Sequence, residues 1–459
     1  MQNINFSNRQ IFGNIFLKTN GSFTLLNLYS FRRMVLSEVD FNTLLMCKEA
    51  IDKGDELSAS EKALYECLIE KKQILSEDLL ANYFALKSKE HEDRLYQIKH
   101  KINHITISPT FSCNFNCIYC YQRDFNAKKD SLSAESIDNI CNAIAIINKT
   151  DNYLDGITAV TINGGEPLQS KNINTINRIV DCFAKPGIKL HLLTNGYNIL
   201  KYKEQIDFSK FYSIQVSLDN IDPFTSKING VNHPISQKVF EGLAYLMQFD
   251  CFITISTVLS KELIANIDEF IRKLTSVGIA NNDRCRIGIA PIMAFGKSTL
   301  DDSFLTLEEF IEAREQIKQK QLPRNLDLEN ISEVRWIKRA LTRKTNERID
   351  GRASMCSILT NRGIHFAPNG QIYWCLCADP SVGSLGRYLP EIDIDEGAID
   401  RCIHKSVYSI PECTSCEYKY LCSSGCPLHC VAATGDYSKP FCGFFHAPKF
   451  WANLEKLLD

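Results

Sequence analysis

The chain has 459 residues, of which 44% are hydrophobic and 23% are charged, a composition typical of folded globular proteins. Lys plus Arg (52) nearly balance Asp plus Glu (54), and the formal charge of −2 offers no general attraction to nucleic acid or anionic lipid. No apolar stretch is long enough to cross a bilayer, and the start lacks the layout of a signal peptide. We therefore expect a cytoplasmic protein with no nucleic-acid or membrane partner.

Residues 1–100 are expected to form a small α+β domain. Its apolar, aromatic opening carries Asn20-Gly21, a pair typical of two-residue hairpin turns. A hairpin followed by short helices is compatible with a winged-helix-like arrangement, and the absence of a basic patch argues against DNA binding. Segments with helical periodicity, or with a charge run typical of a solvated helix face or linker, follow at 40–54, 59–75 and 85–101.

Residues 101–300 alternate short β-branched runs with helical segments. Near-continuous apolar strands separated by helices are typical of a parallel sheet covered by helices. Six such units predict an α/β fold, a partial (βα)6 barrel of the TIM type, whose active groups would lie at the carboxyl ends of the strands. The predicted strands lie within 102–109, 156–164, 188–196, 211–219, 251–259 and 284–292.

The rest of the chain divides into two further parts. Residues 301–350 are helical and charged, and we expect them to form a bridge. Residues 351–459 are loop-rich, with cysteines in place of a conventional core and a predicted hairpin at Asn369-Gly370.

Nineteen cysteines are unusual for a cytosolic chain, where thiols stay reduced, and clustered cysteines therefore indicate metal. Three lie within 113–120, and ten lie within 356–442. The remaining six are scattered through apolar surroundings and are expected to be small buried hydrophobes. These are Cys47, Cys67, Cys141, Cys182, Cys251 and Cys285.

Cys113, Cys117 and Cys120 form a C-x3-C-x2-C motif on the loop that leaves the first predicted strand. Three thiolates this close can hold three irons of a 4Fe-4S cube and leave the fourth iron without a protein ligand. A zinc site is the alternative, but zinc normally takes four ligands, and no fourth Cys or His lies nearby in the sequence.

This triplet, followed by Gly164-Gly165-Glu166-Pro167 after the next strand, resembles the radical S-adenosylmethionine (SAM) superfamily. The resemblance implies that the open iron binds the amine and carboxylate of SAM. An electron, delivered by a donor such as flavodoxin or ferredoxin, would then split SAM into methionine and a 5′-deoxyadenosyl radical.

The resemblance also implies which residues contact SAM. Glu166 would accept hydrogen bonds from the SAM amine, and the glycines would let the backbone approach closely. Asn195, Ser217 and Asp219 end buried strands and would bind methionine or ribose, although turn and capping roles are the alternative. Tyr119 would lie against the adenine or belong to the core. The full predicted SAM set is Tyr119, Gly164, Gly165, Glu166, Asn195, Ser217 and Asp219.

The carboxyl-terminal cysteines resemble the SPASM extension of radical SAM enzymes, which houses two auxiliary 4Fe-4S clusters and would bring the total to three. The inner cluster lacks a fourth ligand, for which Cys377 is the first candidate and Cys430 the second, unless that iron contacts substrate. By resemblance, the outer ligands are Cys413, Cys416, Cys422 and Cys442, and the inner ligands are Cys356, Cys375 and Cys426. Packed or solvated roles are expected for Cys402, His365, His404, His429 and His446.

Members of the SPASM group mostly modify peptides and proteins, and an auxiliary cluster can accept the electron released when a new bond forms. The amino-terminal domain resembles the recognition domain with which peptide maturases bind a leader peptide as an added strand. We therefore expect a maturase that cross-links a ribosomally made precursor peptide through a carbon–carbon, ether or thioether bond. The alternatives are an anaerobic sulfatase-maturing enzyme, which forms formylglycine, and a zinc-stabilised binding scaffold. The sequence identifies no catalytic base.

Overall fold

We analysed the fold in a computed structural model. It describes residues 10–11, 14–19, 22–27, 33–71, 77–98, 102–115, 117, 120, 122, 130–219, 235–291, 305–328, 338, 363–375, 384–403, 405–414, 416, 419, 423–427, 430, 434–436 and 438–440. Tyr119, Cys356, Cys377, Cys422, Cys442, His404, His429 and His446 lie outside these residues.

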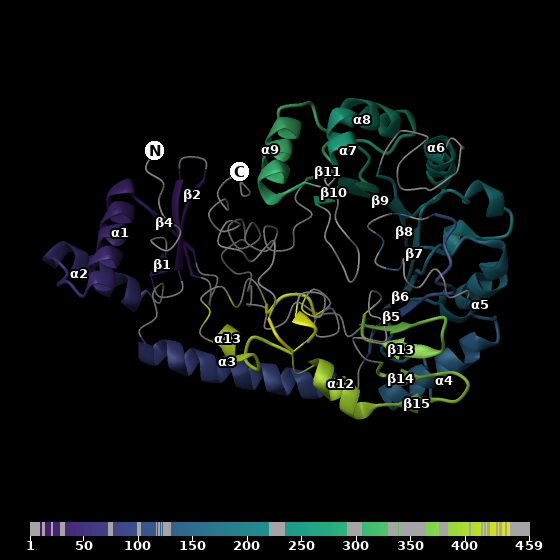
Figure 1. Cartoon of the computed structure of the whole chain (residues 1–459), viewed down its shortest axis with the longest axis horizontal. Coiled ribbons are helices and arrows are strands. Elements are labelled where there is room, and N and C mark those ends of the chain that lie inside the picture. Colours follow the sequence, from purple (N-terminus) through teal and green to yellow (C-terminus); the bar gives the residue numbers. More distant parts are fainter. Residues whose placement is uncertain are drawn as a thin grey trace.

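The amino-terminal region is a four-stranded antiparallel sheet with helices beside it (Figure 1). The predicted hairpin is confirmed for its strands, since Thr19 pairs with Ser22; the turn residues themselves lie outside the described part. Leu25 and Leu44, both fully buried, join the sheet to the first helix. The winged-helix-like assignment stays a prediction. The elements are β1 (Gln10–Ile11), β2 (Asn14–Thr19), β3 (Ser22–Asn27), β4 (Arg33–Leu36), α1 (Glu38–Lys53) and α2 (Ala59–Glu70).

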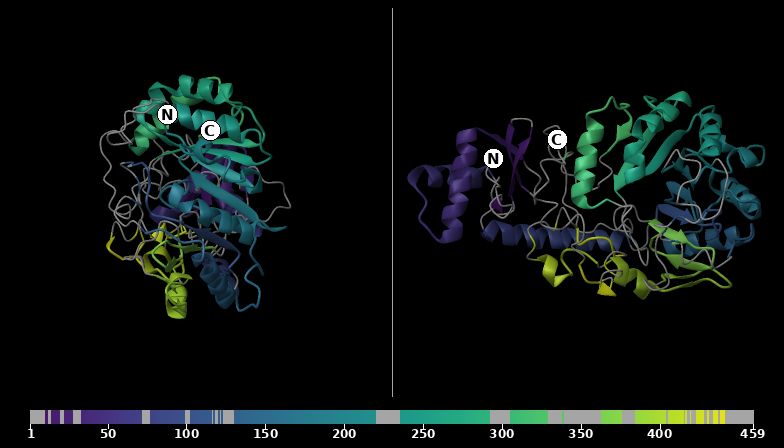
Figure 2. Two further views of the ribbon diagram at one scale, coloured as in Figure 1. Left: turned by 90° about the vertical axis from the view of Figure 1, so that its right-hand side faces the viewer. Right: turned by 45° about the horizontal axis from the view of Figure 1, so that its top comes forward.

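A long helix, α3 (Glu77–Ile98), runs from this region along the carboxyl-terminal segment (Figures 1 and 2). The ring of His91 lies 5.4 Å from the ring of Tyr408. The ring of Phe84 lies under the ammonium of Lys419, 3.6 Å from its centroid. The charged run that begins at residue 85 is helical as far as Ile98, where the described part ends, and α3 packs against the cysteine-rich segment.

The centre of the molecule is a parallel sheet, and each predicted strand of the barrel is confirmed. Neighbours along the chain are neighbours in the sheet, as in a partial TIM-type barrel. Figure 1 shows the sheet curving, with the helices on its outer side. Its strands are β5 (His104–Ile107), β6 (Ala159–Ile162), β7 (Lys189–Thr194), β8 (Ser213–Ser217), β9 (Phe252–Leu259) and β10 (Cys285–Pro291). Its helices are α4 (Ser136–Asn148), α5 (Ile173–Phe183), α6 (Ile235–Leu246), α7 (Lys261–Ala265) and α8 (Ile267–Ser276).

Alternation along the strands separates two faces. In β7, Leu190 and Leu192 are buried, whereas the intervening His191 is half-buried. In β9, Ile253 and Ile255 are buried in the same way beside the half-buried Thr254. One face therefore packs under the helices, and the other presents polar side chains.

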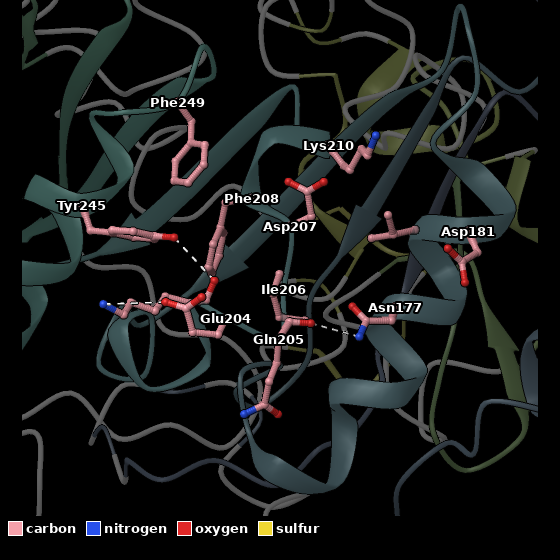
Figure 3. A pocket seen from close by; sticks show the side chains of 12 residues that line it. Asn177, Asp181, Glu204, Gln205, Ile206, Asp207, Phe208, Lys210, Tyr245 and Phe249 are labelled. Carbon is pink, nitrogen blue, oxygen red and sulfur yellow. Dashed lines mark hydrogen bonds and ion pairs between the residues drawn. The ribbon is translucent and has the colours of Figure 1, made fainter.

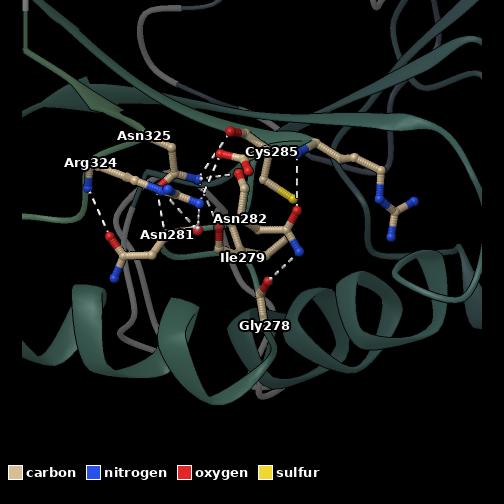
Figure 4. A network of polar contacts seen from close by, with 9 residues as sticks. Gly278, Ile279, Asn281, Asn282, Cys285, Arg324 and Asn325 are labelled. Carbon is tan, nitrogen blue, oxygen red and sulfur yellow. Dashed lines mark hydrogen bonds and ion pairs between the residues drawn. The ribbon is translucent and has the colours of Figure 1, made fainter.

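The sheet extends beyond β10 in a segment for which we predicted a helical bridge. Helix α9 (Leu307–Lys318) confirms part of that prediction, and a capping box of Thr306 and Glu309 starts it. Strand β11 (Leu326–Asp327) departs from the prediction of a helical bridge, because it pairs in parallel with β10. Asn325 makes this pairing possible: its amide donates to the carbonyls of Ile279 (2.8 Å) and Cys285 (3.0 Å), as Figure 4 shows.

The opposite edge joins the carboxyl-terminal segment to the barrel, which the sequence did not indicate. Strand β12 (Gly363–Phe366) pairs in parallel with β5, so the whole sheet has 11 strands among the described residues. The hairpin predicted at Asn369-Gly370 is confirmed, with Phe366 opposite Ile372 and five residues between them. The later elements are β13 (Gln371–Tyr373), β14 (Gly386–Arg387), β15 (Asp393–Ile394), α12 (Glu396–Ile403) and α13 (Pro411–Thr414).

Five of the six isolated cysteines are buried as predicted, and Cys67 is half-buried. Across the described ranges, no helix combines the length and apolarity that a bilayer crossing requires.

Candidate functional site

The loop after β5 carries the cysteine triplet at the carboxyl end of the parallel sheet. Cys113, Cys117 and Cys120 are all half-buried. The amide of Phe115 donates to the Cys113 sulfur (3.3 Å), and the amide of Cys120 donates to the carbonyl of Cys117 (3.1 Å). The loop is therefore locally folded around three half-buried cysteines.

The Gly164-Gly165-Glu166 loop after β6 docks directly on the cysteine loop. The amide of Gly165 donates to the carbonyl of Thr110 (2.9 Å), and the amide of Glu166 donates to that of Ser112 (3.0 Å). A Cβ atom on Gly165 would lie 2.2 Å from the Ser112 oxygen, and one on Gly164 would lie 2.3 Å from the Thr110 oxygen. The two glycines are thus required for this close backbone approach.

Glu166 connects the loops after β6 and β7. Its side chain is fully buried. Its Oε1 accepts from the Leu168 amide (2.9 Å) and the Thr194 hydroxyl (2.7 Å), and its Oε2 accepts from the Asn195 amide (2.7 Å). Burial raises the pKa of Glu166 to about 7, against the lowering effect of these donors. Oε2 keeps the capacity to accept one further hydrogen bond.

Asn195 reaches from the end of β7 to the cysteine loop. Its Nδ2 donates to Oδ1 of Asn114 (2.9 Å) and lies 3.9 Å from the sulfur of Cys113. Its Oδ1 accepts from the amide of Tyr197 (3.1 Å), which fixes the orientation of the side chain. Three consecutive loops of the barrel therefore meet around Cys113.

Ser217 and Asp219 lie at the end of the next strand, β8. Ser217 is exposed at the open end of the sheet. Asp219 is half-buried, and its Oδ1 accepts from the amide of Val258 in β9 (2.8 Å). This contact joins the ends of two neighbouring strands, and the two roles considered for Asp219, in a turn or cap and toward SAM, both stay predictions.

Sequence reasoning did not single out Gln169 or Asn114. The Gln169 amide donates to the carbonyl of Ser112 (2.7 Å) and to that of Glu166 (3.1 Å), which ties the two loops together. Asn114 supplies the acceptor for Asn195. Neither residue stands in a recognisable spacing, because both contacts join parts of the chain that are far apart in sequence.

The cysteine triplet suits a cluster better than a single ion. Within the part of the chain that the structure describes, no three His, Cys, Asp or Glu side chains converge as ligands of one metal ion. A 4Fe-4S cube distributes its thiolates over different irons, whereas tetrahedral zinc draws its ligands onto one point. Burial raises the pKa of Cys113 most, the Glu166 carboxylate raises it next, and the thiols of Cys117 and Cys120 add smaller effects in the same direction. Iron would favour the thiolate form and offset these effects.

The carboxyl-terminal cysteines lie on the far side of β12. Cys375 lies two residues after the end of β13, and Cys413 lies in α13; Cys416 and Cys426 are half-buried and Cys430 is fully buried. His365 in β12 is buried as predicted, and its Nε2 lies 2.7 Å from the hydroxyl of Ser108, just before the cysteine loop. Burial lowers the pKa of His365 to about 4, so this histidine is neutral.

A cavity of about 440 Å³ opens on the outer surface, remote from these loops. Figure 3 shows Asn177 of α5 and the aromatic rings of Tyr245, Phe208 and Phe249 around it. These residues precede the starts of β7, β8 and β9, so the cavity lies at the amino ends of the strands. The cysteine loop lies at the opposite ends, and the cavity is therefore separate from the candidate site.

Residues 107–274 match the family model of the Radical SAM superfamily. Among curated proteins, GTP 3′,8-cyclase of Campylobacter jejuni subsp. doylei is 28% identical over 181 residues, which are 39% of this chain and 53% of that protein. The GTP 3′,8-cyclase of Bradyrhizobium diazoefficiens is 28% identical over 205 residues, 44% of this chain and 56% of that protein. The chain thus spans about half the length of these relatives.

Solved structures share the fold over more of the chain. Streptococcus suis SuiB bound to S-adenosylmethionine has a TM-score of 0.50 and 16% identity, and covers 93% of this chain and 97% of its own. Native anSMEcpe with bound AdoMet and Cp18Cys peptide has a TM-score of 0.53 and 12% identity, and covers 77% of this chain and 96% of its own. These likenesses concern the fold.

Proposed function

We propose that this chain, whose residues 107–274 form a radical SAM domain, is a peptide maturase that cross-links a ribosomally made precursor peptide. When bound, SAM and its cluster supply hydrogen-atom abstraction, and an auxiliary cluster supplies an acceptor for the electron released as the new bond forms. The peptide loses one hydrogen atom and one proton, together with that electron, so the product is lighter by two hydrogens.

The observation that carries this proposal is an apolar edge of the amino-terminal sheet that pairs with no further strand among the described residues. Strand β4 lies at the edge of that sheet. Val35 in β4 is 68% exposed, and Val39 and Met46, on one face of α1, are 73% and 60% exposed. An edge strand beside exposed apolar side chains favours the addition of an extended peptide as a further strand.

In this proposal the residues around Cys113 hold SAM. Cys113, Cys117 and Cys120 hold the cluster, and Asn195 and Ser217 face the open end of the sheet, where the nucleotide would lie. Glu166 is fully buried and holds the loops in register through its three hydrogen bonds; its proposed contact with the SAM amine would require these loops to shift and uncover Oε2. The glycines keep the two loops in contact. The carboxyl-terminal cysteines hold two auxiliary clusters in a SPASM-type extension.

GTP and a sulfatase are the two alternatives to a precursor peptide as the substrate. The curated relatives act on GTP by name, but they match over about two fifths of this chain, which is the radical SAM core. The structural neighbour solved with a peptide covers 77% of the chain, and SuiB covers 93%. The wider likeness favours a peptide substrate, and the extra amino-terminal sheet favours a precursor peptide over a sulfatase.

The test is to incubate the iron-reconstituted full chain anaerobically with SAM, a reductant and each short peptide encoded beside its gene. Mass spectrometry should show a peptide lighter by two hydrogens, with a new cross-link in its fragment spectrum. Parallel reactions contain GTP or a sulfatase-derived peptide, the latter assayed with an aldehyde-specific reagent. Cys113→Ala should abolish the mass change, whereas Cys251→Ala, at a buried cysteine remote from the loop, should retain it.

Cleavage of SAM accompanied by no change in any neighbouring peptide would contradict the peptide assignment while leaving the radical SAM chemistry intact. Conversion of GTP, or of the sulfatase-derived peptide, would identify that compound as the substrate in place of a precursor peptide. Stoichiometric zinc without iron would instead favour a binding scaffold.

A further inference from the structure

Lys419 is a buried cation in the cysteine-rich segment. The residue is 3% exposed, and it lies between Cys416 and the predicted ligand Cys422 in the sequence. Its ammonium donates to the carbonyl of Thr414 and lies over the ring of Phe84 from α3, 3.6 Å from the centroid. A carbonyl and an aromatic face stabilise a cation, but neither neutralises its charge.

A buried charge requires an opposite charge nearby, because removal from water is costly. Among the described residues Lys419 has no carboxylate within ion-pair distance, and its amide donates to the carbonyl of Cys416 (3.3 Å). Burial lowers the pKa of its ammonium to about 8, and Cys416 and then Cys413 act against this lowering. Both cysteines are predicted ligands of the outer auxiliary cluster. A 4Fe-4S cluster with four thiolates carries net negative charge, which would provide the missing counter-charge.

A second, independent observation comes from the next turn. Ser423 and Ser424 are 0% and 1% exposed, and neither hydroxyl has a hydrogen-bond partner in the described part of the chain. Both residues, and Gly425 after them, have positive φ angles of 58°, 65° and 79°. The amide of Ser423 donates to the carbonyl of Lys419 (2.7 Å), so the cation and the two hydroxyls belong to one folded unit. Buried hydroxyls normally find an acceptor, and the sulfur atoms of a cluster are acceptors.

We propose that Lys419, supported by the hydroxyls of Ser423 and Ser424, raises the reduction potential of the outer auxiliary cluster so that it accepts the electron released by the peptide. A fixed positive charge and hydrogen bonds to sulfur both stabilise the more negative, reduced cluster. Lys419 is thus a positioning residue for electron transfer. The inference rests on the proposed function both for the auxiliary cluster and for the electron that this cluster accepts.

The test is an EPR-monitored redox titration of the full chain carrying Cys113→Ala, Cys117→Ala and Cys120→Ala, which removes the signal of the SAM cluster. Lys419→Met, which keeps length but not charge, should reduce the ratio of reduced to oxidised cluster at least tenfold at the original midpoint. For a one-electron couple this corresponds to a shift of about 59 mV to lower potential. Lys419→Arg should stay near the original midpoint, and Phe84→Leu, which preserves the cation, is the matched packing control.

The double variant Ser423→Ala and Ser424→Ala should shift the midpoint in the same direction by less. Iron content and circular dichroism confirm that each variant retains its clusters and its fold. An unchanged midpoint in Lys419→Met with the clusters retained overturns the inference. A starting protein that holds no auxiliary cluster, shown by about four irons per chain before the triple substitution, overturns the SPASM part of the proposed function instead.

Discussion

The loops around Cys113 and the segment around Lys419 both carry cysteines, yet they are organised differently. In the barrel, Gly165, Glu166 and Asn195 are held by backbone and side-chain bonds between neighbouring strands. In the carboxyl-terminal segment, strands β14 and β15 are two residues long, and buried donors such as Trp374 Nε1 lack a protein acceptor in the described residues. The barrel is stabilised by an apolar core to which Tyr388 and Val407 of the cysteine-rich segment also belong, and the clusters proposed for that segment would add to its order when bound.

The largest expected effect is loss of the SAM cluster. Cys113→Ala should abolish 5′-deoxyadenosine formation and lower the iron content from about twelve to about eight per chain. Thermal stability should change little, because the sulfur is half-buried on a loop. Cys141→Ala, inside the buried face of α4, is the matched control and should keep iron and activity while losing about 1 kcal/mol. Full activity in the Cys113 variant would rule out the assignment of this loop.

The second-largest expected effect is a difference in amide hydrogen exchange between the two regions after iron is removed. After anaerobic chelation, amide hydrogen exchange within 384–440 should accelerate about tenfold or more, because the metal contributes the folding energy there. Strands β5–β10 should exchange within about twofold of their original rates, since their amides are paired within an apolar core. Mass spectrometry of peptic fragments measures both. Equal acceleration in the two regions would contradict the comparison.

Substitution of Gly165, whose backbone packs against the cysteine loop, should have the next largest effect. Gly165→Ala places a Cβ against the carbonyls of Ser112 and Phe111, which must push the two loops apart. We expect more than about a tenfold loss of SAM cleavage and a loss of about 1–3 kcal/mol in unfolding free energy. Gly363→Ala in β12 is the control, because its Cβ would meet the nearest atom at 3.5 Å, an ordinary contact. Similar SAM cleavage and stability in the two variants would show that the close backbone approach at Gly165 is not required.

Glu166→Gln should have a smaller effect that depends on pH. Three groups donate hydrogen bonds to the Glu166 carboxylate. The NH2 group of Gln would face one of these donors, and the lost hydrogen bond should lower the free energy of unfolding by about 1–3 kcal/mol. The wild-type pKa is raised to about 7 in the fold, so the stabilisation from proton binding is complete below the unfolded value and is lost as pH rises through about 7. Denaturation between pH 5 and pH 8 should show a steeper decline for the wild type than for the variant. Parallel profiles would show that the carboxyl does not titrate in this range.

Much of the barrel could be predicted because its patterns are local. Apolar strands, their helices and the positions of Cys113 and Glu166 at strand ends follow from periodicity over short windows. The turn pairs at Asn20-Gly21 and Asn369-Gly370 likewise indicated hairpins that the strand pairing confirms. The bridge prediction was incomplete, since the two residues of β11 pair with β10 through the backbone and no periodic pattern indicates so short a strand.

The sequence by itself determined the order of the strands, the cysteine triplet and the glycines at the end of β6. Only the tertiary structure decided which distant residues meet: Glu166 with Asn195, 29 residues later, and Ser108 with His365, 257 residues later. It also decided that β12 completes the sheet beside β5 and that α3 covers Lys419. The reason is physical. Periodicity encodes which face of an element is buried, whereas the choice of partner depends on chain closure and on packing that no short window contains.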